Sequence, residues 1–233
     1  MKKLLIAFGC SWTNGDIACF GNAWPEKLSN SLEMEVVNLG KVASGNERIH
    51  NSVIEKISMT PKEQIGYVVV MWSGFNRWDF HNDTIFIPCS PKQIQSEQRV
   101  EIANVIMKHG YQSYEHQLKK TIIYMVSIQN FLKSKNISFL QGFSFFSNHP
   151  QETKDSIKYL LEYDLFYELD TSNSIGFPYC NLVGGYSLDD LLREHPYDHM
   201  GVSYKDEPLM KGSHPNDKGH ELISDYIKEI IND

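Results

Sequence analysis

The chain has few cysteines and no long apolar or basic run. Four cysteines occur in 233 residues, and no two have C-x-x-C spacing, which argues against a zinc site or a thioredoxin-like motif. Their low density is typical of reduced thiols in a cytosol-like compartment. A net charge of -7 without a cluster of lysine and arginine disfavours a nucleic-acid partner. No apolar run approaches the roughly 18 residues that a membrane span needs, so no membrane partner is expected.

The first residues have some features of a secretion signal. Two lysines precede the apolar run Leu4–Phe8. This run is shorter than the roughly 7–15 apolar residues of a signal peptide, and no cleavage motif follows it directly. We therefore predict that it is a first strand and that the protein is cytoplasmic.

Apolar runs alternate with helical patterns along the chain. The predicted strands are Leu4–Phe8, Glu35–Leu39, Tyr67–Trp72 and Ile137–Leu140, with a fifth near residues 163–170. The predicted helices cover residues 24–33, 46–58, 114–136 and 217–233. This alternation predicts an α/β fold, a three-layer α/β/α sandwich with a parallel, flavodoxin-like central sheet. We expect a single domain over residues 1–233, with irregular insertions around 78–112 and 165–213.

Polar and small residues follow the carboxyl ends of the predicted strands, where sites form in open α/β sheets. Ser11 follows the first strand, and the turn at residues 38–45 ends the second. Gly74 and Asn76 follow the third strand, and His214 stands just before the last helix. These residues are a nucleophile, a set of oxyanion donors and a base, so their pattern predicts an acyl-transfer site.

Four sequence blocks resemble those of the SGNH/GDSL hydrolase family, in variants similar to its bacterial and phage members. They are Gly9-Cys10-Ser11 (the family has Asp in place of Cys10), residues 38–45, Gly74-Phe75-Asn76 (followed by Arg77 rather than Asp), and His214-Pro215-Asn216 with Gly219-His220. The blocks occur in the family's order and span essentially the whole chain. The resemblance implies a serine esterase that requires neither a metal nor another cofactor.

The resemblance also implies a role for each block. Ser11 would attack a small carboxylic ester, such as an O-acetylated carbohydrate, and His214 would act as the base. The oxyanion donors would be the N–H of Ser11, an N–H in the 43–45 turn and the side-chain amide of Asn76. The family's glycine in this turn is Ala43 here, and Gly45 lies two residues further on, so both stay open as the donor.

The residue expected to orient the histidine is absent from its usual place. The family has an Asp three residues before the histidine, and this chain has Lys211 there. Either Ser11 and His214 act as a dyad, or Asp206 or Asp217 supplies the carboxylate. The replacement also favours an alternative, a non-catalytic module that binds a glycan or a partner. A further alternative is an acyltransferase, in which a sugar hydroxyl intercepts the acyl-enzyme.

Several other residues have simpler structural explanations. His195 and His199 have the spacing of a metal-ligand pair on a helix, but Pro196 favours an irregular surface segment. His220 is expected to be structural, and Cys10 is expected to face away from Ser11 and not to act as the nucleophile. The aromatic residues expected mainly in the core are Trp72, Trp78, Phe143, Phe145 and Phe146.

Overall fold

The computed structural model describes residues 2–15, 22–80, 83–86, 101–102, 104–105, 108–109, 113–146, 150–194, 200–201 and 214–232. The strands are β1 (Leu4–Gly9), β2 (Glu35–Gly40), β3 (Ile65–Trp72), β4 (Arg77–Phe80), β5 (Asp83–Phe86), β6 (Phe139–Phe143), β7 (Ser174–Ile175), β8 (Met200–Gly201) and β9 (His214–Pro215). The α-helices are α1 (Ser11–Asn14), α2 (Trp24–Ser31), α3 (Asn46–Met59), α5 (Tyr114–Ser134), α6 (Pro150–Leu161), α7 (Leu188–Glu194) and α8 (Asp217–Asn232). Short 3-10 helices are η1 (Lys62–Gln64), η3 (Asp164–Glu168), η4 (Thr171–Asn173) and η5 (Asn181–Val183).

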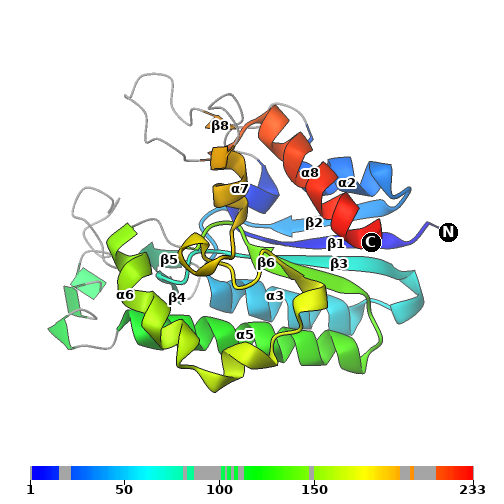
Figure 1. Cartoon of the computed structure of the whole chain (residues 1–233). Helices are drawn as coiled ribbons and strands as arrows, with labels where there is room; N and C mark the ends of the chain where they lie inside the picture. The colour runs from blue at the N-terminus through cyan, green and yellow to red at the C-terminus, as the bar shows by residue number, and fades with distance from the viewer. Residues whose placement is uncertain are drawn as a thin grey trace.

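The central sheet is parallel and has the order β2-β1-β3-β6-β7. This is the flavodoxin-like order, in which the chain starts near one edge and then crosses to the other. Helices cover both faces, with α2, α7 and α8 on one side and α3, α5 and α6 on the other (Figure 1). The predicted three-layer α/β/α sandwich is confirmed.

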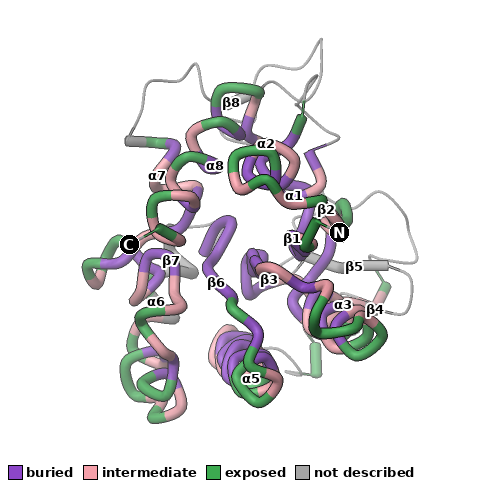
Figure 2. Tube along the Cα trace, turned by 90° about the vertical axis from the view of Figure 1, so that its right-hand side faces the viewer, coloured by how far each residue is buried: buried purple, intermediate pink, exposed green. Residues whose placement is uncertain are grey.

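The side chains of β1 alternate between the two faces, as they must in a strand. Leu5 and Ala7 pack into the apolar cluster that includes residues of α2, α7 and α8. Ile6 and Phe8 pack into the cluster that includes residues of α3 and α5. Because both faces are apolar, β1 is a continuous apolar run and lies in the buried centre of the molecule (Figure 2).

The first three predicted strands are confirmed, and the fourth begins later than predicted. The chain leaves α5 through a turn in which Asn136 has φ 49, and the N–H of Ile137 still bonds to the carbonyl of Leu132. Sheet pairing therefore starts only at Phe139 and continues through Gly142 to Phe143. Gln141 and Gly142 interrupt the apolar run after Leu140, so the apolar pattern alone does not indicate this second half of the strand.

The strand predicted near residues 163–170 is wrong, because this segment contains η3. Phe166 and Leu169 are buried, whereas Tyr167 between them is 62% exposed. Burial of residues three apart is the pattern of a 3-10 helix and not of a strand. The fifth strand of the sheet is the short β7, a few residues further along the chain.

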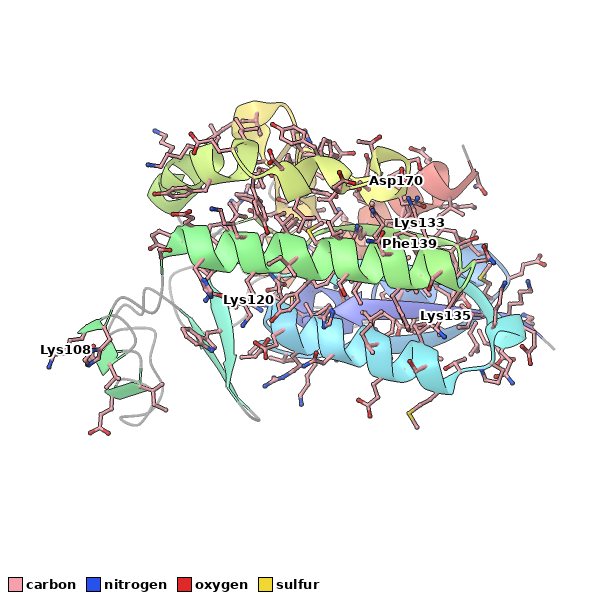
Figure 3. The ribbon with its side chains drawn as sticks, turned by 90° about the horizontal axis from the view of Figure 1, so that it is seen from below. Lys108, Lys120, Lys133, Lys135, Phe139 and Asp170 are labelled. Atoms are coloured by element: carbon pink, nitrogen blue, oxygen red, sulfur yellow. The ribbon has the colours of Figure 1, made fainter. Side chains whose placement is uncertain are left out.

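Polar contacts fasten the segment after η3 onto α5. Gln129 of α5 donates to the carbonyl of Glu168 and accepts from the N–H of Asp170. Lys133 forms an ion pair with Asp170, and both are labelled in Figure 3. Hydrogen bonds from Lys133 and Ser172 hold the pKa of Asp170 well below its usual range. The segment is thereby held where β7 can pair with β6.

Candidate active site

Ser11 and His214 lie together at the carboxyl end of the sheet. Ser11 is the first residue of α1, directly after β1, and only 3% of it is exposed. His214 lies in β9, shortly before α8. The Nε2 atom of His214 is 2.7 Å from the Oγ atom of Ser11. This is hydrogen-bond distance, and with the hydroxyl as donor the imidazole is neutral and carries its proton on Nδ1.

The surroundings of His214 favour its neutral form. Burial is the main cause and the positive charge of Arg77 is the second, and together they lower the pKa of His214 to about 4. The imidazole is therefore uncharged at neutral pH, and its Nε2 lone pair can accept the proton of Ser11.

The other nitrogen of His214 is buried. Its Nδ1 atom has no hydrogen-bond partner among the described residues. Asp206 and Lys211, which bear on the choice between a dyad and a triad, lie outside the described residues. Asp217 is in the first turn of α8, where its charge partly opposes the lowering of the pKa of His220 by burial.

Two glycines allow α1 to approach the ends of β1 and β2. A Cβ atom on Gly9 would lie 2.1 Å from the Oγ1 atom of Thr13. A Cβ atom on Gly40 would lie 2.4 Å from the backbone nitrogen of Asn14. Larger residues at either position would push α1, and Ser11 with it, away from the sheet.

Asn38 joins the second block to the first. Its Nδ2 atom donates to the carbonyl of Thr13 at 3.0 Å and to the carboxylate of Glu26 at 3.0 Å. Its Oδ1 atom accepts from the N–H of Gly40 at 3.0 Å. The asparagine is thus a structural link, although the sequence pattern showed it only as the start of a turn.

Asn46, the residue directly after the second block, bonds to Ser73, the residue directly before the third block. Its Oδ1 atom accepts from the N–H of Ser73 at 2.8 Å, and its Nδ2 atom donates to the carbonyl of Ser73 at 3.0 Å. Nδ2 also donates to the Oγ1 atom of Thr121 on α5. Asn76 follows three residues after Ser73 and is 4% exposed, so the candidate oxyanion amide is in a buried and cross-linked region.

The two candidate backbone donors in the turn at residues 43–45 differ in their hydrogen bonding. The N–H of Gly45 donates to Asp79 at 2.8 Å and is therefore already engaged. The N–H of Ala43 has no hydrogen-bond partner among the described residues. Ala43 has φ 60, in the left-handed region that favours glycine.

Cys10 and most of the aromatic residues of the region belong to the core. The thiol of Cys10 lies 3.8 Å from the Oγ atom of Ser144, and the side chain packs into the apolar cluster on the α2 and α8 face. The buried aromatic residues are Trp72, Phe143, Phe145 and Phe146, whereas Trp78 is half-buried.

His220 has a structural contact, as expected from the sequence. It is 1% exposed, and its Nδ1 atom accepts the N–H of Trp24 at 3.1 Å, at the start of α2. Burial, as the main cause, lowers the pKa of His220 to about 4. The bond ties α8 to α2 and requires an unprotonated Nδ1 atom.

We predict that His220 makes the fold sensitive to acid. In the unfolded chain a histidine has its ordinary pKa of about 6.5, so lowering the pH from about 6.5 towards 4 protonates the unfolded state first. This removes about 2 kcal/mol of the free energy of unfolding between pH 7.5 and pH 5. Urea unfolding at both pH values gives the loss in the free energy of unfolding between pH 7.5 and pH 5. This loss should be smaller in His220→Asn than in the wild type, by about 2 kcal/mol. An equal loss in both proteins would contradict the prediction.

A cavity of about 300 Å³ lies beside the second block, between β2 and α3. Its charged lining residues are Lys41 and Arg48, and its apolar lining includes Phe8 and Ile49.

Among the described residues, no group of three histidine, cysteine or acidic side chains could hold a metal ion. His195 and His199 lie outside the described residues. The described helices include none that is both long and apolar enough to cross a bilayer.

Residues 18–176 match the family of unknown function DUF6071. The chain belongs to this family. The match begins after Ser11 and ends before His214, so both members of the hydrogen-bonded pair lie outside the matched segment of this DUF6071 chain. A comparison with curated proteins gives no match.

Solved structures of SGNH/GDSL hydrolases have the same fold as this DUF6071 chain. A member of the lipolytic protein G-D-S-L family from Veillonella parvula DSM 2008 is 11% identical, with a TM-score of 0.56, over 99% of this chain and 98% of that one. A catalytic mutant of Axe2, an acetylxylan esterase from Geobacillus stearothermophilus, is 14% identical, with a TM-score of 0.53, over 98% and 94%. The lipase Lip_vut3 from a goat rumen metagenome is 12% identical, with a TM-score of 0.54, over 98% and 97%.

Two residues of the region were not recognised from the sequence of this DUF6071 chain. Arg77 was noted only as a departure from the third block, and Asp79 was not noted at all. Their partners, Ser44 and Gly45, are more than thirty positions away along the chain. The available signal was the Arg-x-Asp spacing directly after the third block, which puts both side chains on one face of a strand.

Proposed function

We propose that the chain is a serine esterase that hydrolyses a small carboxylic ester through an acyl-enzyme on Ser11. The observation that carries this proposal is the 2.7 Å hydrogen bond between Ser11 and the neutral His214. A serine hydroxyl is a weak nucleophile until an adjacent base removes its proton, and the pair has the geometry for that step. The fold shared with esterases and a lipase supports the same reaction class.

In the proposed reaction the Oγ atom of Ser11 attacks the ester carbonyl carbon while its proton passes to Nε2 of His214. The oxyanion of the tetrahedral intermediate accepts hydrogen bonds from the N–H groups of Ser11 and Ala43 and from the amide of Asn76. His214 then gives its proton to the departing alcohol. A water molecule, deprotonated by His214, attacks the acyl carbon. The bond from this carbon to Oγ of Ser11 then breaks, His214 returns the proton to Oγ, and the acid is released. The arrangement works as a dyad, and a carboxylate at Asp206 would turn it into a triad.

The comparisons and the proposed mechanism support a choice of substrate class. One structure with this fold is an acetylxylan esterase and another is a lipase. We propose a short acyl ester, with an O-acetylated carbohydrate as the first candidate. Hydrolysis of p-nitrophenyl acetate, p-nitrophenyl butyrate and acetylated xylo-oligosaccharides by the wild type tests this choice. Turnover of none of them would contradict it.

The pH dependence of the reaction should report the pKa of His214. The base is active when neutral, so kcat/KM should fall only as the pH drops through about 4. Initial rates with p-nitrophenyl acetate should therefore be nearly the same at pH 5.5 and pH 7. A decline centred near pH 6.5, the ordinary value for histidine, would show that the base is not the buried imidazole described above.

A further inference from the structure

Two side chains of β4 hold one peptide group of the second block. Arg77 and Asp79 are two positions apart on β4, so they project from the same face of the strand. The Nη1 atom of Arg77 donates to the carbonyl of Ser44 at 2.9 Å. The Oδ1 atom of Asp79 accepts from the N–H of Gly45 at 2.8 Å. These carbonyl and N–H groups belong to the same planar peptide bond.

Holding both ends of a peptide group fixes its orientation. If the Ser44–Gly45 peptide rotated by half a turn, its N–H would face the guanidinium of Arg77 and its carbonyl would face the carboxylate of Asp79. In the first contact two hydrogen-bond donors would face each other, and in the second two acceptors would. Neither group could turn to water instead, because Ser44 is 1% exposed. The described orientation is therefore strongly favoured over the rotated one.

Each of the two side chains is itself held in place. The Oδ2 atom of Asp79 accepts from the backbone N–H of Arg48 at 2.8 Å, and the Nε atom of Arg48 lies 3.9 Å from the Oδ1 atom. Arg77 lies over the ring of Phe145, 4.8 Å from its centroid, at the end of β6. Burial lowers the pKa of Arg77, and interactions with Cys10 and Asp79 partly oppose this effect.

Gly45 leaves room for the carboxylate of Asp79. A Cβ atom at this position would lie 2.7 Å from the Oδ2 atom of Asp79, so any other residue would force this carboxylate to shift. The glycine thus has a packing reason to be where it is. Two residues earlier in the turn, Ala43 has a left-handed backbone conformation.

We propose that Arg77 and Asp79 are positioning residues for the proposed ester hydrolysis. By fixing the Ser44–Gly45 peptide they hold the turn so that the N–H of Ala43 faces the oxyanion of the intermediate. This inference rests on the proposed function, and it extends that function to side chains that never touch the substrate. A misplacement of about 1 Å in such a donor can cost about 100-fold in rate.

A simpler role for Asp79 is to cap α3, since its carboxylate binds N–H groups at the start of that helix. Glu47 provides a matched control, because it is an acidic residue in the first turn of α3 that pairs with Lys120 and does not bind the turn. Both Asp79→Asn and Glu47→Gln remove a negative charge next to the helix N-terminus. Only Asp79→Asn leaves a single acceptor oxygen for the two N–H groups, of Gly45 and Arg48, that the carboxylate binds.

The experiment measures kcat and KM for p-nitrophenyl acetate, together with the rate at which a fluorophosphonate labels Ser11. For Asp79→Asn and Arg77→Met we expect kcat to fall about 10- to 100-fold with KM changed less than about threefold. Arg77→Lys should recover part of the loss, and Glu47→Gln should remain within about twofold of the wild type. The double variant Arg77→Met/Asp79→Asn should lose no more than about the larger single effect, because both side chains hold one peptide group.

Hydrogen exchange supplies a readout that does not depend on activity. In Asp79→Asn at least one of the amides of Gly45 and Arg48 should exchange faster than in the wild type, because one oxygen cannot replace both acceptors, whereas in Glu47→Gln neither should. Equal kcat losses in Asp79→Asn and Glu47→Gln, or folded variants with wild-type kcat, would overturn the positioning role alone. A folded wild type whose Ser11 is neither labelled nor active would overturn the proposed function, and the positioning role with it.

Discussion

Replacing Ser11 by alanine is expected to slow the hydrolysis of p-nitrophenyl acetate at least about 1,000-fold. The alanine leaves no hydroxyl for His214 to activate, although the oxyanion donors remain. His214→Ala should cause a loss of similar size, because without the base the Ser11 hydroxyl is a poor nucleophile. The measurement is kcat/KM for each variant, after circular dichroism has shown that each one is folded.

The double variant adds a test that single losses cannot provide. Residues that act as one unit have non-additive effects, so Ser11→Ala/His214→Ala should be about as slow as either single variant. Ser29→Ala is a matched control, since Ser29 is also buried but bonds to the carbonyl of Glu26 on α2. Its activity should stay within about twofold of the wild type. Wild-type activity in Ser11→Ala would show that the hydrolysis has another origin.

Replacing Asn76 by alanine is expected to lower kcat by about 100- to 1,000-fold. The proposed role of this amide is to donate to the oxyanion, which exists only in the intermediate and the transition states around it. KM should therefore change much less than kcat. Asn76→Asp should be at least as slow, because an anionic side chain would repel the developing negative charge.

The control for this prediction is Asn51→Ala. Asn51 is an exposed residue of α3, and among the described residues its side chain has a hydrogen-bond contact with its neighbour His50 alone. We expect wild-type kinetics from this variant. A folded Asn76→Ala with a raised KM and an unchanged kcat would contradict the oxyanion role and would favour a role for Asn76 in ground-state binding.

The placement of the site followed from local patterns. Leu4–Phe8 and Tyr67–Trp72 are continuous apolar runs, so they predicted buried parallel strands, and the residues after such strands must share one edge of the sheet. This reasoning placed Ser11 and His214 near each other although 203 positions separate them along the chain. Short 3-10 helices such as η3 were missed because their period of three is easily taken for an irregular strand.

The hydrogen-bonded supports of the site could not be predicted in the same way. Asp79 binds the turn at Gly45, and His220 binds the N–H of Trp24, across 34 and 196 positions respectively. Such bonds depend on the spacing between packed elements, which no local pattern encodes. The proposal of Ala43 rather than Gly45 as the oxyanion donor likewise rests on the bond by which Asp79 already engages the N–H of Gly45.

The most direct test of the central claim is covalent labelling of the wild type by a fluorophosphonate, followed by mass spectrometry of the intact protein and of its peptides. An activated serine displaces fluoride from phosphorus and keeps the phosphonyl group. We expect one adduct per chain, located on Ser11, absent from Ser11→Ala and strongly slowed in His214→Ala. A folded wild type that takes up no label, or takes it up on a residue other than Ser11, would show that Ser11 is not an activated nucleophile.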